Sequence, residues 1–203
     1  MKKVLVLAAA LMLFAAPAMA VISNSAHDFT QSPYNAAEIC VFCHTPHGAA
    51  NVADAPLWNH QLTTSTFTVY SSTTIDGSVS QPSGRSILCL SCHDGSVAID
   101  SYGGATGTTF INGVADAPNS PKLGTNLQND HPVSITYRDD LDSGLRADDG
   151  TGASVTNGSV TLPLYSNKVE CASCHDVHNG SGFNPMLRAD NGGSALCLVC
   201  HDK

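Results

Sequence analysis

The sequence predicts a chain that is mostly loop, with short α-helices at four copies of one cysteine–histidine motif. Three observations lead to this fold class. The motif recurs four times, the segments between its copies are rich in Gly, Pro, Ser and Thr, and aromatic residues make up only 6% of the 203 residues. A chain of this composition has too little apolar volume for an ordinary core. We therefore expect bound groups to complete the core, and the polypeptide without them to be largely unfolded.

The first 20 residues are typical of a secretory signal peptide. Lys2 and Lys3 precede an apolar run over residues 4–16, and residues 18–20 read Ala-Met-Ala, which suits a cleavage site. We expect an exported chain that begins at Val21 and has no membrane anchor, with an uncleaved anchor as the alternative. Removing two of the nine basic residues and none of the 17 acidic ones changes the formal charge from -8 to -10. Such a charge argues against nucleic acid as a partner.

All eight cysteines fall in Cys-x-x-Cys pairs that are followed at once by His. The four motifs comprise Cys40, Cys43 and His44; Cys89, Cys92 and His93; Cys171, Cys174 and His175; and Cys197, Cys200 and His201. In this motif two thiols form thioether bonds to the haem edge and the imidazole binds the iron as proximal ligand. A redox disulfide has no need of the His, and a zinc knuckle pairs thiols from two motifs. The sequence therefore predicts four haem c groups in a multihaem cytochrome c with a haem-organised core.

Five histidines outside the motifs are candidates for the sixth, distal ligand of each iron. They are His27, His47, His60, His131 and His178. The expected mature chain has a single methionine, Met186, so imidazole is the ligand type that can serve every iron. We predict bis-histidine ligation and hence low reduction potentials. For each of the five, an ordinary surface or core imidazole is the alternative.

The settings of these histidines support the ligand interpretation. His60 follows the only tryptophan, Trp58, whose ring is a suitable wall for a porphyrin. His131 lies between Asp130, which can orient a ligand ring, and Pro132.

Two motifs carry a further histidine three residues after their own. His47 follows His44, and His178 follows His175. Residues three apart in a helix or tight turn project from neighbouring points on one side, so the two imidazoles of each pair can bind different irons. The haems concerned must then lie close together.

The order of motifs indicates a duplicated two-haem unit. Cys-x-x-Cys-His-x-x-His is followed both times by Leu-Cys-Leu-x-Cys-His-Asp. We expect a signal peptide at 1–20 and a tetrahaem domain at 21–203, made of two dihaem units at about 21–130 and 131–203 that are not separate folding domains. Between the motifs we expect loops, an acidic one over 139–158, and short strands at 66–70 and 133–137. Helices should be confined to the haem motifs.

This inventory favours electron transfer over catalysis. Enzymatic haems keep one iron position open, whereas five spare histidines face four irons here, and the sequence contains no other catalytic constellation. We therefore predict no enzyme active site. The protein's task would be to space the haems and tune their potentials.

The chain resembles the OmcE-like tetrahaem cytochromes of metal-reducing bacteria. The resemblance rests on the segments around His27, His60 and His131, on the first two motifs, and on the run from Cys171 to His178. It implies a subunit of an extracellular filament, or nanowire, that carries electrons at the cell surface to redox partner proteins or metal oxides. The resemblance implies that the distal ligands within the chain come from His27, His60, His131 and His178. In such homopolymers the neighbouring subunit supplies one axial histidine, and His47 is the candidate for that role here. Five candidates for four irons leave one surplus, which is either His27 or His47. A monomeric periplasmic shuttle and a small-oxyanion reductase with one five-coordinate haem are the alternatives.

Overall fold

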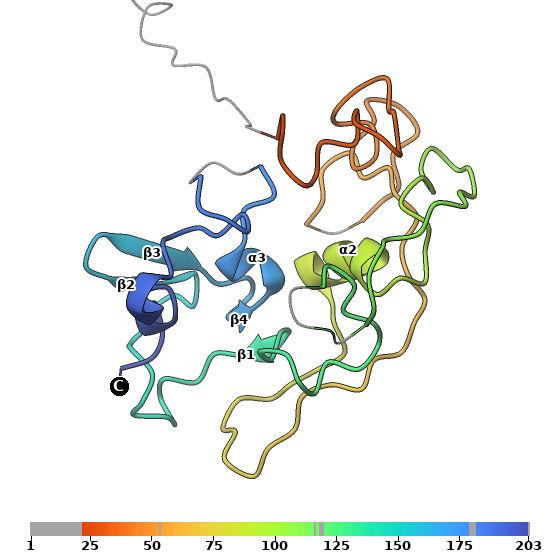
Figure 1. Ribbon diagram of the computed structural model, residues 1–203. Helices are drawn as coiled ribbons and strands as arrows, with labels where there is room; N and C mark the ends of the chain where they lie inside the picture. Colours follow the sequence, from red (N-terminus) through yellow and green to blue (C-terminus); the bar gives the residue numbers. More distant parts are fainter. Residues whose placement is uncertain (1–21, 53, 116, 118–119, 179–181, 203) are drawn as a thin grey trace, which may run out of the picture.

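The computed structural model describes residues 22–52, 54–115, 117, 120–178 and 182–202 (Figure 1). As predicted, the chain is mostly loop with few, short elements. In chain order these are α2 (Gly84–His93), β1 (Ile135–Thr136), β2 (Ser154–Asn157), β3 (Val160–Pro163), β4 (Lys168–Val169), α3 (Cys171–Cys174) and the 3₁₀ helices η1 (Gly192–Ser194) and η2 (Cys197–Val199). The expected signal peptide lies outside the described residues, and so does its cleavage site.

The helices coincide with three of the four motifs. The second motif forms the end of α2, the third contains α3 and the fourth contains η2, while η1 lies just before the fourth. The first motif is instead a hydrogen-bonded turn, in which the amide of His44 donates to the carbonyl of Cys40 at 2.9 Å. Pro46 disfavours helical backbone at the residue before it, which limits this segment to a turn.

Two small antiparallel sheets lie in the later part of the chain. β1 pairs with β4, with Ile135 opposite Val169. β2 and β3 form a hairpin in which Val155 lies opposite Leu162, and both side chains are buried. Gly158, the first residue of the two-residue connection, has φ 61°, a conformation that glycine adopts without strain.

Three expectations about strands need correction. The acidic segment at 139–158 is not loop throughout, because its last residues form β2 and pair with β3. The expected strand at 66–70 is wrong: the described residues there form only an isolated parallel bridge between Thr68 and Asn126. The expected strand at 133–137 is shortened to β1. A short segment forms a strand only where a second strand lies beside it and completes its backbone hydrogen bonds. For β2, the hairpin turn brings β3 into this position.

Four small hydrophobic clusters take the place of one core. Two are built from residues between Phe29 and Leu127, and two from residues between Ile135 and Cys200. In Figure 1 the earlier part of the chain, coloured red to green, lies on one side and the later part on the other. α2 and α3 pack against each other where the two parts meet (Figure 1). The second and third motifs are therefore neighbours at the centre of the molecule.

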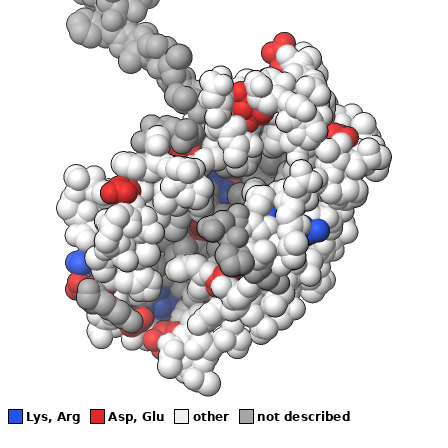
Figure 2. Space-filling model, in the orientation of Figure 1, with Lys and Arg blue, Asp and Glu red and all other residues white. Residues whose placement is uncertain are grey.

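Charged side chains are sparse on the face of the molecule shown in Figure 2. On the face shown in Figure 2, acidic side chains are scattered and basic ones are few. Among the described residues, no helix has both the length and the apolar character needed to cross a membrane.

Candidate haem-binding sites

The cysteines of consecutive motifs lie beside one another. Cys43 and Cys92 pack against the cluster around Phe42, and Cys174 and Cys200 pack against the cluster around Val199. The thiols of Cys89 on α2 and Cys171 on α3 are hydrogen-bonded to each other. All eight cysteines are free of disulfides. The four motifs thus follow one another in space in the order in which they occur in the sequence.

Burial makes Cys43 and Cys92 poor thiolates. It raises the pKa of Cys43 to about 11 and that of Cys92 to about 12. The hydrogen bond that Cys89 shares with Cys171 raises the pKa of Cys89 and lowers that of Cys171. A zinc site needs ionised thiolates, whereas a thioether is uncharged and tolerates burial. The environment therefore suits thioether bonds to haem.

Three of the motif histidines each face one histidine from outside the motifs. Ring centroids are 6.0 Å apart for His27 and His93, 6.4 Å for His44 and His178, and 6.4 Å for His131 and His201. An iron–imidazole bond of about 2.0 Å, and a ring nitrogen about 1.1 Å from its centroid, would separate two imidazoles on opposite sides of one iron by about 6.2 Å. The residues therefore fit three bis-histidine haems.

Three of the proximal imidazoles are held in the tautomer that iron binding requires. The Nδ1 atoms lie near proline carbonyls: His44 at 2.8 Å from Pro56, His93 at 2.6 Å from Pro121 and His175 at 3.0 Å from Pro185. A carbonyl oxygen only accepts, so each Nδ1 carries the proton and donates it. The lone pair of each ring is then on Nε2, where a metal can bind.

The first, third and fourth motifs share a backbone arrangement that we call the clasp. A clasp is a four-residue segment that pairs antiparallel with the end of its motif; the clasps are residues 56–59, 185–188 and 143–146 for the first, third and fourth motifs. In the first clasp, Thr45 donates to Leu57 at 2.9 Å and Asn59 donates to Cys43 at 3.0 Å.

The corresponding backbone bonds recur in the other two clasps. They join Asp176 to Met186 at 2.7 Å and Arg188 to Cys174 at 2.9 Å in the third, and Asp202 to Gly144 and Arg146 to Cys200, both at 2.8 Å, in the fourth. A clasp therefore fixes the orientation of the proximal histidine from outside the motif.

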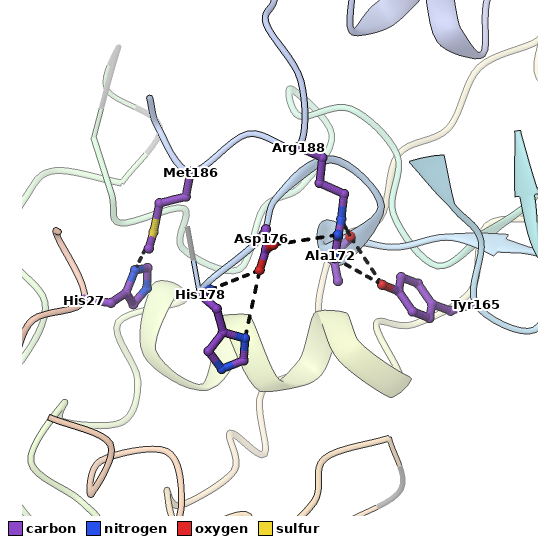
Figure 3. A network of polar contacts seen from close by, with 7 residues as sticks. All are labelled: His27, Tyr165, Ala172, Asp176, His178, Met186 and Arg188. Carbon is purple, nitrogen blue, oxygen red and sulfur yellow. Dashed lines mark hydrogen bonds and ion pairs between the residues drawn. The ribbon is translucent and has the colours of Figure 1, made fainter. Parts of the chain in front are cut away.

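The paired histidines from outside the motifs are oriented by neighbours of different chemistry. Nδ1 of His131 lies 3.0 Å from the carbonyl of Pro132. In Figure 3, Asp176 lies between His178, at 3.9 Å, and Arg188, at 4.0 Å, whereas His27 points its Nδ1 at the sulfur of Met186, 2.8 Å away. Burial, followed by the neighbouring His93 and His175, lowers the pKa of His27 to about 4, so its ring is neutral, as a ligand must be.

His60 does not face a motif histidine. It is buried, with 3% of its surface exposed, and both ring nitrogens lie near backbone carbonyls, Nδ1 at 2.7 Å from Gln61 and Nε2 at 3.1 Å from Ala98. Its ring also contacts the sulfur of Cys92 at 3.5 Å. A carbonyl oxygen only accepts and a neutral imidazole carries a single N–H, so only one of these two carbonyl contacts is a hydrogen bond.

His175 and His47 complete the inventory. Within the described residues, His175 packs against no other imidazole ring, although it is close enough to depress the pKa values of His27 and His93 after burial has done so. His47 is exposed, and the described contacts of this residue are made by its backbone. In the part of the chain that the structure describes, the proximal His175 and the exposed His47 thus pack against no other imidazole ring.

Two buried donors fit the carboxylates of a haem edge. Nε1 of Trp58 and Nε of Arg85 are buried and have no hydrogen-bond partner among the described residues. Trp58 lines a cavity of about 380 Å³ together with His60 and Ser101. Haem propionates are acceptors of the kind that such donors require. Neither the clasps nor these donors were foreseen from the sequence, although proline follows the first and third motifs at similar spacings, as Pro56 and Pro185.

Comparison with known families bears on the last part of the chain. The model of the doubled CXXCH motif matches residues 165–203, which contain the third and fourth motifs. No curated protein matches this chain. The doubled motif indicates a haem-binding c-type cytochrome, a class of proteins that transfer electrons and are typically exported.

Proposed function

We propose that this protein carries four haem c groups and transfers electrons along them as a subunit of an extracellular filament. The observation that carries the proposal is the pairing of three proximal histidines with three distal ones at 6.0–6.4 Å between ring centroids. The bound irons supply one-electron exchange, and the chain supplies their ligands, spacing and exclusion of water.

The proposed ligand set follows from these pairs. His178, His27 and His131 serve as distal ligands for the irons of His44, His93 and His201, respectively. His60 keeps a structural role, because both of its nitrogens face carbonyls. The iron of His175 then needs a ligand from outside the chain.

A second copy of the chain is the proposed source of that ligand. His47 is exposed and lies outside the three pairs, so the His47 imidazole of one subunit can bind the His175 haem of the next. A heterologous contact of this kind extends into a filament when its rotation does not close a ring. Filament ends at the cell surface would meet redox partner proteins or metal oxides.

The exposed His175 also favours a second candidate function. If no neighbour supplies a ligand, the third haem is five-coordinate, as in an oxyanion reductase. If a group that does not come from a second copy of the chain supplies the sixth ligand of this haem, the protein is instead a monomeric periplasmic electron shuttle.

A matched pair of histidine variants separates these possibilities. The haem-loaded protein should have the mass of four haems, form filaments under the electron microscope and show only low-spin haem. His47→Ala should abolish the filaments and convert one haem in four to high spin, whereas His60→Ala should leave four low-spin haems. Filaments and four low-spin haems in His47→Ala would refute the cross-subunit ligand. A high-spin haem that binds nitrite in the unassembled wild type would favour the reductase.

A further inference from the structure

We propose that the buried carboxylate of Glu170 lowers the reduction potentials of the haems at the second and third motifs relative to the other two. The inference rests on the proposed tetrahaem function and names the residue that makes the haems unequal. Glu170 itself neither attaches a haem nor ligates its iron.

Glu170 lies at the junction of the two central motifs. It immediately precedes Cys171 and is 3% exposed. On the facing helix α2, Ser86 precedes Cys89 by one turn and is fully buried. Ser86 Oγ accepts a hydrogen bond from the amide of Cys171 at 3.0 Å and donates one to the Glu170 carboxylate. The carboxylate is thus within one helical turn of an attachment cysteine on each side.

The hydrogen-bond partners of the Glu170 carboxylate are all donors. Ser134 Oγ, which accepts from the amide of Ser83 at 3.1 Å, lies 2.9 Å and 3.1 Å from the two carboxylate oxygens. The backbone amide of Ser173 also donates to the Glu170 side chain, in a capping box at the start of α3. Two hydroxyls and one amide therefore present hydrogens to this group and hold it in place.

Among the described residues, Glu170 forms no ion pair with Lys, Arg or His, and none of its side-chain hydrogen-bond partners belongs to the first or fourth motif. An oxidised haem carries one more positive charge than a reduced one, so a nearby anion stabilises the oxidised form and lowers the potential. The effect is strong in the interior, where water does not screen it.

The same contacts make Glu170 a positioning residue. Through Ser86 and Ser134 it joins α2 and the chain before β1 to the start of α3. A structural role alone would affect haem loading or ligand geometry. The charge predicts something more specific, namely a change in two potentials out of four.

The test is an anaerobic redox titration of the haem-loaded protein, with dithionite as the reductant and visible absorbance as the readout. In Glu170→Gln, two of the four midpoint potentials should rise, each by about 59 mV, which is a tenfold change in a one-electron equilibrium constant. The low-spin spectrum should be unchanged. Glu170→Asp keeps the charge and should restore the wild-type potentials.

The chain offers a matched control. Glu38 is the other glutamate, lies two residues before Cys40 and is exposed, so solvent screens it. Glu38→Gln should leave all four potentials unchanged. Should Glu170→Gln not mature, Ser134→Ala, which keeps the charge but removes a donor to it, should lower the same two potentials.

The outcomes are distinguishable. Potentials that do not move in Glu170→Gln, or that move equally at all four haems, would overturn the role of Glu170 while leaving a tetrahaem protein intact. A wild-type protein that holds fewer than four haems would instead refute the proposed function on which the inference rests.

Discussion

The second motif and the other three present the same five residues in different ways. The second is the end of a ten-residue helix, α2, which packs against both Leu127 and α3. The first, third and fourth are short turns or helices of three or four residues, and each is held by a clasp. One motif is thus positioned by a helix that others share, and three are positioned by local backbone pairing.

The comparison teaches that the motif does not determine its own orientation. In both arrangements a carbonyl outside the motif accepts the proximal Nδ1 hydrogen, from Pro121 for the helical motif and from Pro56 for the first clasped motif. The two arrangements differ in how many haems a structural defect should affect. A clasp defect should affect one haem, whereas a defect in α2 should reach the haem at α3 as well.

The largest effect is expected from truncating the aromatic side chain of the first clasp. Trp58 is 8% exposed and meets the His44 ring edge-on at 6.4 Å between centroids. Trp58→Ala should lower the free energy of unfolding by about 3–5 kcal/mol, because it leaves a large cavity. Denaturation of the haem-loaded protein, followed by Soret absorbance, measures this loss. One haem should change its spectrum, and Trp58→Phe should recover most of the stability; disturbance of several haems would contradict a local clasp.

A somewhat smaller loss is expected in α2, with a wider reach. Leu90 is 1% exposed and packs with Phe67 and Leu127. Leu90→Ala should lower the free energy of unfolding by about 2–5 kcal/mol. Because α2 packs against α3, the spectra of two haems should change, which magnetic resonance of the oxidised protein can resolve. Leu90→Met, which conserves volume, is the control, and a change at one haem alone would break the comparison.

How far the sequence predicts this fold depends on whether a feature is local. The four motifs and the short helices at them could be predicted because the signal is a contiguous run of residues. The hairpin was missed, although Gly158-Ser159 between two short runs that contain Val and Thr is a usable turn signal. The clasps pair residues that are 12 to 56 positions apart in the sequence through backbone groups, which leave no mark on side-chain composition.

The same distinction applies to the site. Histidine was the predicted ligand type because one methionine cannot serve four irons, but the sequence could not say which histidines meet. His178 lies beside His175 in the chain and yet faces His44, which depends on how the two halves of the molecule pack. His60 has the residue type of a ligand, but the sequence gives no sign that the Gln61 and Ala98 carbonyls lie near its two ring nitrogens. Glu170 gives no signal in the sequence, since its importance lies in burial.

The smallest effect tests whether the backbone of a clasp is under strain. Leu57 has φ 56°, a left-handed conformation that is unfavourable for residues with a Cβ, and its side chain is 54% exposed. Leu57→Gly should change the free energy of unfolding by less than about 0.5 kcal/mol, since relief of strain offsets the lost backbone order and the lost apolar contact. Leu57→Val should lower it by about 1–2 kcal/mol, because a β-branched side chain tolerates this conformation least. Chemical denaturation of both haem-loaded variants measures the difference. If Leu57→Gly proves much less stable than Leu57→Val, the first clasp holds its histidine through the leucine side chain and not through the left-handed backbone.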